Sequence, residues 1–258
     1  MSLLEKIVRS NIYLYLLSKY LYSNFFYYFF YEKEFKILKK INRKFKNNKI
    51  ILDIGANNGN SAKTIRIFEK SSKILSFEPN KIFYKELSKL KKKINFFNFK
   101  IVGGDNFNNI KYLYIPIFKN FFLDSQASVS EDLSKDSVKR GIFDKSIWKK
   151  INFKKIKCNF VKIDKFKTKP YFIKIDTEGS EHKVLEGLKD TIKKYKPLIM
   201  VEKNQLNYKK IIVYLRSYDY RPYLYQGKVL EVFQNAKNTT QEHSNIIFIC
   251  KKNIKEIF

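Results

Sequence analysis

Residues 49–62, KIILDIGANNGNSA, decide the fold of this chain. They open with a short apolar, β-branched run, 50–54, which is typical of a buried strand. Gly55 and Gly59 follow, and Ser61 is a good N-cap for a helix. Glycine lets the backbone approach a ligand closely, and a helix N-terminus offers unpaired N–H groups to an anion. The stretch therefore predicts a strand, a tight turn and a helix that together cradle a ligand.

The usual phosphate-binding motifs do not fit this turn. A dinucleotide fingerprint needs glycines where the chain has Asn57 and Asn60, and no Gly-Lys-Ser/Thr phosphate loop follows. The next predicted strand, 73–78, ends at Glu78, and an acid there can accept hydrogen bonds from both hydroxyls of a ribose. Such an acid without a pyrophosphate loop suits an adenosine that carries a carboxylate, and S-adenosylmethionine is such a molecule. The alternative is a βα turn that merely requires glycine.

Apolar periodicity predicts one α/β domain over residues 49–258. Five strands alternate with helices, then a hairpin flanks Gly227 and a last strand follows. A hairpin-like pair that closes a five-strand α/β series fits a seven-stranded, mostly parallel sheet with one antiparallel strand and helices on both faces. The strands are predicted at 49–54, 73–78, 94–102, 171–175, 197–202, 221–225, 229–233 and 245–251, and the helices at 61–70, 82–92, 181–194 and 208–218.

Residues 106–165 form an insertion before the fourth strand of the series. Strands are predicted at 111–118 and 155–164, with a polar helical stretch between them. An insertion at this place would lie on the substrate side, over the ligand end of the sheet, as a lid. Surface decoration is the alternative.

Residues 1–48 form a helical extension that is strongly aromatic in its first part. Lys19 interrupts the apolar run, and the uncharged part is far shorter than the about 20 residues that a membrane span needs. A signal peptide is also not expected, because no small-residue cleavage site follows. Residues 1–31 could pack on the domain, lie at a membrane interface or form the surface of a homo-oligomer.

The chain of 258 residues carries a formal charge of +29. Lysine supplies most of that charge and arginine is scarce, whereas proteins that read bases and phosphates favour arginine. We therefore expect no specific nucleic-acid partner. Cys158 and Cys250 are far apart and show neither metal-ligand spacing nor a disulfide framework, so we expect a cytoplasmic setting, with peripheral membrane contact as an open alternative.

A second informative stretch is the segment that follows the fourth predicted strand. Asp176, Glu178, Glu181 and His182 come within a few residues of the strand end. This is more acid than a helix cap needs, and the carboxyl ends of parallel strands meet at one edge of the sheet. We expect some of these residues to be functional. Glu202 ends the fifth strand at the same edge.

In order and spacing the chain resembles the FkbM family of S-adenosylmethionine-dependent methyltransferases. The matching segments are DIGANNG at 53–59, FEPN at 77–80, IKIDTEGSE at 173–181, VLEG at 184–187 and PLIMVE at 197–202. The resemblance implies a Rossmann-like methyltransferase fold and O-methylation, often of a sugar or another small hydroxylated molecule.

For the reaction, a hydroxyl acceptor needs a general base. Asp176 is the first candidate, because it ends the central strand. His182 is the second, since its pKa suits the task, although an exposed helix residue is the alternative interpretation. Glu178 and Glu181 would orient substrate hydroxyls or lysines, or bind a metal. We expect no metal, because hard-cation sites need several oxygens in a geometry that a sequence does not show.

For the cofactor, S-adenosylmethionine, each predicted contact has its own residue. Asp53 would order the first loop, partly by accepting backbone N–H groups, and Glu78 would bind the ribose. The remaining predicted contacts are the loop residues Gly55, Asn57 and Gly59 at the methionine end, Asn80 beside the adenosine, and Asp105 at the adenine amino group. For Asp105, a plain turn acid is an equal alternative.

Two alternative functions remain open at this stage. The charge suggests an RNA or protein methyltransferase, but DTEG at 176–179 differs from the Asn/Asp-Pro-Pro-aromatic segment that amino-methylating enzymes often carry. A catalytically inactive scaffold associated with a membrane or glycan is the other. The intact set of Gly55, Gly59 and Glu78 speaks against it.

Overall fold

The computed structural model describes residues 3–25, 31–46, 50–204, 207–225, 227–233 and 245–257. The chain forms two compact units. Unit 1 comprises Met1–Phe30 and Ile110–Cys158, and unit 2 comprises Tyr31–Asn109 and Asn159–Phe258. The predicted extension, residues 1–48, is thus divided between the two units, and the predicted insertion contributes most of unit 1.

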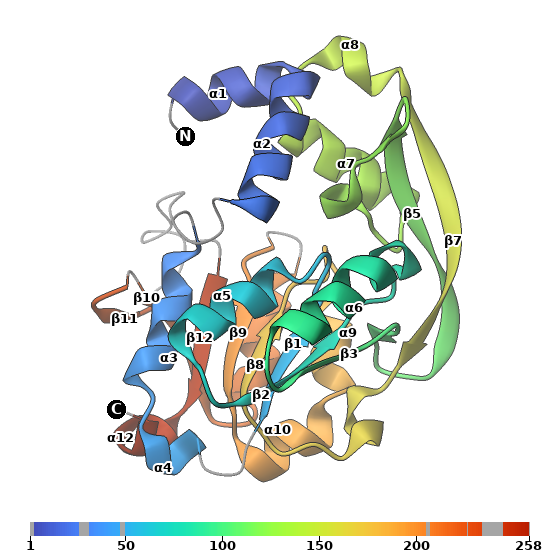
Figure 1. The fold of residues 1–258 in the computed structure, drawn as a ribbon. Helices are drawn as coiled ribbons and strands as arrows, with labels where there is room; N and C mark the ends of the chain where they lie inside the picture. The colour runs from blue at the N-terminus through green and yellow to red at the C-terminus, as the bar shows by residue number, and fades with distance from the viewer. Residues whose placement is uncertain are drawn as a thin grey trace. The chain divides into compact units, whose positions relative to one another are not determined.

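Unit 2 is built on an eight-stranded sheet with the order β11-β10-β12-β9-β8-β1-β2-β3 (Figure 1). The five strands from β3 to β9 run parallel, and β12 is antiparallel to both of its neighbours. The strands are β1 Ile50–Ile54, β2 Lys73–Phe77, β3 Phe97–Lys100, β8 Pro170–Ile175, β9 Leu198–Glu202, β10 Tyr220–Tyr225, β11 Leu230–Val232 and β12 Asn245–Cys250. The predicted mostly parallel sheet is confirmed, but it has eight strands rather than seven, because both strands of the predicted hairpin and the last strand all join it.

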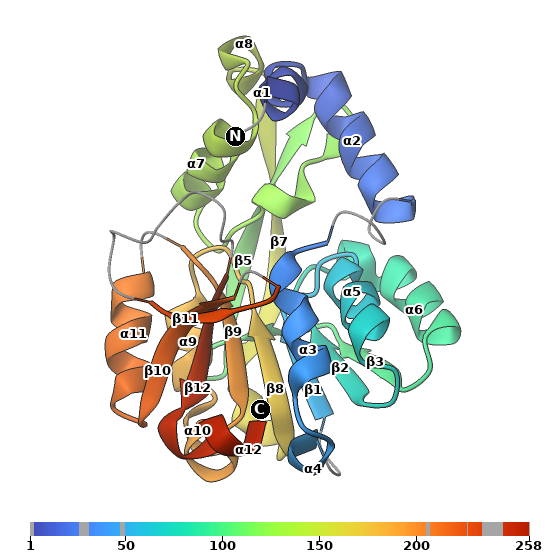
Figure 2. The same cartoon turned by 90° about the vertical axis from the view of Figure 1, so that its left-hand side faces the viewer.

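Helices cover both faces of this sheet, as predicted (Figure 2). One face carries α3 Ile37–Lys40, α4 Arg43–Lys46, α5 Asn60–Phe68, α6 Tyr84–Lys93 and α12 Ile254–Ile257, and the other carries α9 Glu181–Glu186, α10 Lys189–Tyr195 and α11 Tyr208–Arg216. Successive side chains of a strand point to opposite faces. In β1, Ile51 therefore joins the first of two buried clusters and Leu52 the second.

Two predicted elements of unit 2 end earlier than expected, and close contacts at glycines explain both. The third strand does not extend to Val102, because Gly103–Gly104 forms β4, which pairs with β7 in a second sheet. A Cβ at Gly103 would lie 2.3 Å from the Phe160 ring. The helix predicted over 181–194 divides into α9 and α10 at Gly187, where a Cβ would lie 1.9 Å from the backbone oxygen of Asp105.

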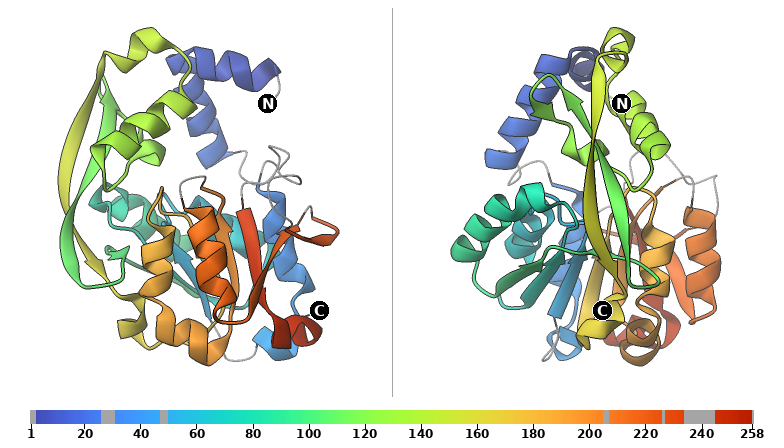
Figure 3. Two further views of the ribbon diagram at one scale, coloured as in Figure 1. Left: turned by 180° about the vertical axis from the view of Figure 1, so that it is seen from behind. Right: turned by 90° about the vertical axis from the view of Figure 1, so that its right-hand side faces the viewer.

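Unit 1 combines the N-terminal helices with two long strands, β5 and most of β7, and with the elements between them (Figure 3). Its elements are α1 Leu3–Ser10, α2 Ile12–Asn24, β5 Asn109–Phe118, β6 Phe121–Phe122, α7 Glu131–Gly141, α8 Lys145–Trp148 and β7 Ile151–Val161. A small core of its own joins Ile12 to Phe118, Leu123, Val138 and other insertion residues. The predicted strands here are confirmed. Among the described residues, no helix is long and apolar enough to cross a membrane.

Candidate functional site

The loops after β1 and β8 meet at the centre of the unit 2 sheet. β1 pairs with β2 on one side and with β8 on the other, so the strand order reverses between them. In open α/β sheets, ligands bind at such a switch point, beside the carboxyl ends of the strands. The Asp176 N–H donates to the Ile54 carbonyl over 3.0 Å, which joins the two loops.

Gly55 is the point of closest approach between these loops. Its φ is +83°, and a Cβ would lie 1.6 Å from the Asp176 carbonyl oxygen. The N–H groups of Gly55 and Ala56 both donate to the Phe77 carbonyl, at 2.9 and 3.1 Å. Only glycine fits this position, because a side chain would meet backbone rather than a movable side chain. The predicted tight turn is therefore present.

The helix after this turn begins differently from the prediction. Gly59, with φ +84°, occupies the N-cap of α5, and Ser61 lies inside the helix. The Ser61 hydroxyl donates to Asp53 Oδ2 over 2.9 Å, so it is already engaged and does not cap the helix. A Cβ at Gly59 would lie 2.5 Å from Leu90, which shows how tightly the helix start packs on α6.

Asp53 is fully buried at the base of the first loop. Its Oδ2 accepts from the Ser61 hydroxyl and, over 2.7 Å, from the Ser76 hydroxyl. Both donors are side-chain hydroxyls rather than the predicted backbone N–H groups. Asp53 thus ties β1 to β2 and to α5, beneath the predicted ligand site.

Lys174 is a site residue that the sequence did not single out. It is 4% exposed, and its Nζ donates to Asp176 Oδ2 over 3.1 Å and to the Gly55 carbonyl over 3.3 Å. Asp53 Oδ1 lies 3.9 Å from the same nitrogen. Burial opposes the charge, but Asp176, Asp53 and Glu32 outweigh it and raise the pKa of the Lys174 ammonium. One buried cation therefore serves both loops.

Glu78 holds the first and second loops together. Its Oε2 accepts from the Asn57 N–H and its Oε1 from the Asn80 N–H, each over 2.8 Å. The side chain is 7% exposed, and burial raises the pKa of its carboxyl to about 7 although both hydrogen bonds favour the charged form. Each oxygen keeps a second lone pair, so the carboxylate can still accept from a ribose.

Asn80 follows at the start of the next turn and is 1% exposed. Its Oδ1 accepts from the Ile82 N–H over 3.1 Å, as an N-cap does. Its Nδ2 is buried and has no hydrogen-bond partner within the described part of the chain. A buried donor without a partner is rare in proteins, and a ligand acceptor would satisfy it.

Asp105 is placed by a different set of neighbours. It is 1% exposed, its N–H donates to the Val161 carbonyl, and its Oδ1 accepts from the Asn106 N–H. Its carbonyl lies against Gly187 at the end of α9. These contacts are those of a junction between the two sheets and α9, and a contact with adenine stays a prediction.

Glu181 shapes the second loop from inside the protein. It is fully buried, and its Oε1 accepts from the N–H groups of Thr177 and Gly179 at 2.9 and 3.0 Å. Its Oε2 accepts from the Asn207 amide. Ser180 stands at the predicted N-cap but makes no side-chain cap bond. Glu181 therefore positions the loop, and a contact between its carboxylate and substrate hydroxyls stays a prediction.

Three carboxylates gather at the carboxyl ends of β8 and β9. Oxygens of Asp176, Glu178 and Glu202 lie within 4.8 Å of one another. Burial raises the pKa of the Glu202 carboxyl well above its usual range, and the charges of Asp176, Glu178 and Glu181 raise it further. The group can hold a proton, accept several hydroxyl hydrogens or ligate a hard cation.

His182 contacts side chains of α9 and α11, and its role as a general base stays a prediction. Its Nδ1 lies 3.8 Å from Glu186 Oε2, and its ring makes an edge contact with Tyr214 of α11 at 5.4 Å. These partners lie along α9 and α11, which fits the alternative interpretation of a helix-surface residue. The other histidine, His243, lies outside the described residues.

The sequence contains a signal that could have identified Lys174 as a site residue. A lysine inside the otherwise apolar strand 170–175 is unusual, because lysine is almost never fully buried without a charge partner. A lysine at this position could therefore have predicted acidic partners at the neighbouring strand ends. The acid at position 202 was placed at the right edge of the sheet, but its closeness to Asp176 and Glu178 came only with the structure.

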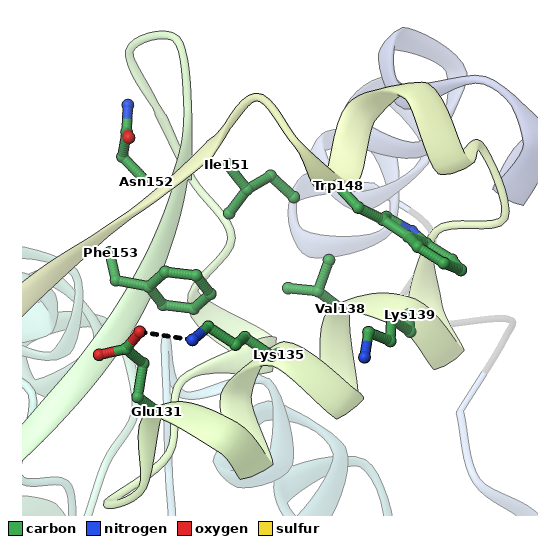
Figure 4. Close-up of a pocket in the computed structure, with 8 residues that line it drawn as sticks. All are labelled: Glu131, Lys135, Val138, Lys139, Trp148, Ile151, Asn152 and Phe153. Carbon is green, nitrogen blue, oxygen red and sulfur yellow. Dashed lines mark ion pairs between the residues drawn. The ribbon is translucent and has the colours of Figure 1, made fainter.

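A separate pocket of about 510 Å³ lies within unit 1, on α7, α8 and the start of β7. Phe153 and Trp148 stand at its two sides, with Val138 and Ile151 between them (Figure 4). The Trp148 indole N–H donates to the Ile142 carbonyl over 2.8 Å, which fixes the ring. The pocket can receive a flat or ring-shaped group between aromatic surfaces.

Comparison with solved structures gives weak matches. A methyltransferase FkbM from Methylobacillus flagellatus KT aligns at 17% identity and a TM-score of 0.48, over 78% of this chain and 43% of that one. This chain thus spans less than half of that protein's length. A precorrin-6y C5,15-methyltransferase from Geobacter metallireducens GS-15 aligns at 11% identity and a TM-score of 0.41, over 83% of this chain and 82% of that one. An rRNA methylase from Streptococcus thermophilus aligns at 12% identity and a TM-score of 0.42, over 83% of this chain and 91% of that one.

Comparison by sequence is more decisive. No curated protein matches the chain significantly. The sequence model of the methyltransferase FkbM domain, however, matches residues 53–222, which is more than half of the chain and includes both loops of the site. The chain therefore belongs to the FkbM family of S-adenosylmethionine-dependent methyltransferases.

Proposed function

We propose that the chain binds S-adenosylmethionine and methylates a hydroxyl of a sugar, a glycan or a similar small molecule. The observation that carries the proposal is the position of Asp176. Its carboxylate is 34% exposed at the switch point, directly beside Gly55, and Lys174 holds it in place. An acceptor hydroxyl would bind at the switch point, and it needs a general base within reach there.

The residues around the first loop fit the cofactor. Glu78 presents a buried carboxylate with lone pairs to spare for both ribose hydroxyls. The buried Nδ2 of Asn80 would donate to the adenosine. The turn at Gly55, which rests on the Asp176 backbone, and the left-handed turn at Asn57 would form the wall beside the methionine end.

The task left to the chain's own residues is to remove the proton of the acceptor hydroxyl. S-adenosylmethionine supplies an electrophilic methyl group, which the acceptor oxygen takes as its C–O bond forms and the C–S bond breaks. Asp176 accepts the hydroxyl proton on its carboxylate. Lys174 keeps that carboxylate oriented, and the raised pKa of Glu202 lowers the total negative charge of the three-carboxylate group. Positioning of the reactants supplies much of the rate.

The same three carboxylates support a hydroxylated acceptor. Asp176, Glu178 and Glu202 offer several acceptor oxygens within a small space, and a sugar offers several hydroxyl donors. The group also resembles a set of hard-cation ligands. Methyl transfer that persists in EDTA would assign the work to the carboxylates and Lys174 alone, and loss that Mg²⁺ restores would add a cation.

We also propose that the protein is located in the cytoplasm. Cys158 and Cys250 are buried thiols that form no disulfide, and a reducing compartment keeps them so.

The decisive test is calorimetric titration of S-adenosylhomocysteine into the wild type and Glu78→Ala. Loss of two ribose hydrogen bonds to a charged group should weaken binding roughly 30- to 1,000-fold. Glu86→Ala is the matched control, because Glu86 is an exposed acid on the neighbouring helix α6. No binding to the wild type would refute the proposal. Equal binding to the wild type and to Glu78→Ala would mean that the ribose binds elsewhere.

A further inference from the structure

We propose that one face of unit 1 lies on the surface of a membrane that contains anionic lipids. The face, named here the aromatic stripe, consists of Tyr13, Leu17 and Tyr20 of α2, which are 54%, 52% and 61% exposed. Their spacing of four and three residues puts them on one side of the helix. This interaction goes beyond methyl transfer and does not depend on the identity of the acceptor.

The helix that carries the stripe is apolar on both sides. On the inner side, Ile12 is 2% exposed and packs with Phe118 and other core residues of the insertion. The Tyr15 hydroxyl accepts from the Gln126 amide over 2.6 Å. Because these contacts fix the inner side, the stripe remains on the outer side of the helix in folded unit 1.

A basic residue and a further aromatic surface adjoin the stripe. The Lys119 ammonium, at the turn between β5 and β6, donates to the Tyr13 hydroxyl over 2.7 Å and lies 5.4 Å from the centre of its ring. Tyr13 also contacts the Phe118 ring edge-on at 6.2 Å. Phe121 pairs across the hairpin with Phe118 and is 50% exposed, so the apolar surface continues onto the hairpin.

The chemistry of this surface favours a membrane over a second copy of the chain. Tyrosine, leucine and lysine together are typical of helices that lie in the membrane interface, where rings rest at the headgroups and lysine reaches outward. The chain carries a formal charge of +29, so two copies repel each other while an anionic surface attracts them.

The test is co-sedimentation of the full chain with phosphatidylcholine vesicles that contain or lack phosphatidylglycerol. The wild type should bind the anionic vesicles and leave the neutral ones largely unbound. The double variant Leu17→Ser/Tyr20→Ser should lose on the order of tenfold or more in partitioning, because two side chains no longer enter the interface. Val213→Ser is the matched control, since Val213 is 69% exposed on α11 of unit 2.

Three outcomes would overturn the proposal. Equal partitioning of the wild type and the double variant would reduce the attraction to charge alone. No vesicle binding by the wild type would remove the membrane altogether. Sedimentation equilibrium that shows a wild-type dimer, absent in the double variant, would assign the stripe to a second copy. Far-UV circular dichroism of the same samples shows whether they are folded, so this test does not depend on the proposed function.

Discussion

Gly55 rests directly on the backbone of Asp176, with room for no Cβ between them: the added atom would lie 1.6 Å from the Asp176 carbonyl oxygen. The contact joins the loop predicted to bind the cofactor to the residue predicted to act as base. A change at Gly55 therefore acts on both parts of the site at once.

We expect Gly55→Ala to destabilise the protein by several kcal/mol and to abolish S-adenosylhomocysteine binding. The methyl group would meet backbone, which cannot move aside cheaply, and the residue would also occupy φ +83°. Urea unfolding and calorimetry measure the two effects.

The matched control for this change is Gly141→Ala. At Gly141, the last residue of α7, the nearest atom to an added Cβ is the end of the Gln126 side chain at 3.2 Å, which has to give by only a few tenths of an ångström, and no backbone atom blocks the Cβ. This variant should be close to wild type in both measurements. A Gly55→Ala protein that binds normally would show that the loops can separate without loss of the site.

A second prediction concerns pH and Glu78. Its carboxyl has a pKa of about 7 in the folded protein, raised from an ordinary 4.5, so the folded state holds a proton that the unfolded state releases. Stability from this group is complete at low pH and is lost as the pH rises through 7. Between about pH 6 and about pH 8, the free energy of unfolding should fall by roughly 1 kcal/mol.

Cofactor binding should show the opposite trend, because the ribose hydroxyls donate to the ionised form. The Kd of S-adenosylhomocysteine should be nearly constant above pH 7 and rise up to about tenfold per pH unit below it. Glu78→Gln should bind weakly at every pH and flatten both profiles. A Kd of the wild type that does not change with pH would mean that Glu78 stays charged or does not bind the ribose.

The position of Glu78 could be predicted from the sequence because it follows from order alone. A strand, a glycine turn, a helix and a second strand ending in an acid put that acid beside the turn in any βαβ unit. The placement of Asp176 beside Gly55 follows from the same rule, as does the acid at the end of β9. The parallel strands and most helix positions were predictable for the same reason.

The contacts that depend on three-dimensional packing were not predictable. Whether Glu181 faces the ligand or the interior depends on how α9 rotates against Asn207, which spacing does not reveal. The imidazole of His182 is directed to Tyr214 by the same rotation. Ser61 lies inside α5 and donates to Asp53, although its position suggests an N-cap, because the buried carboxylate needs a donor. Gly103 pairs with a strand more than fifty residues further along the chain.

A third prediction follows from the burial of Glu181. Glu181→Ala would leave the N–H groups of Thr177 and Gly179 without an acceptor, and each such group costs about 1–3 kcal/mol when buried. We expect the free energy of unfolding to fall by about 3 kcal/mol or more in urea titrations. Glu178→Ala is the comparison, because Glu178 is only partly buried in the same loop, and it should lose far less stability. Equal losses would contradict the structural role of Glu181.

The last prediction separates the roles of Asp176 and Lys174. Asp176→Asn keeps the shape of the site but removes the base, so kcat should fall about 10²- to 10⁴-fold while S-adenosylhomocysteine binds with nearly unchanged Kd.

Lys174→Met should act mainly on stability. Without the ammonium, the buried carboxylate of Asp53 and the neighbouring Asp176 lose their shared counter-charge, and breaking a buried pair by removing one partner costs about 3–5 kcal/mol. Asp176→Asn removes one of the two carboxylates that lack a counter-charge in Lys174→Met. The double variant Lys174→Met/Asp176→Asn should therefore recover part of that loss. A double-mutant cycle in urea should then give a coupling of about 0.5–3 kcal/mol between the two residues. Additive losses would mean that Lys174 serves Asp53 and the Gly55 carbonyl alone, and the orientation of the base would then have to come from the backbone of its own loop.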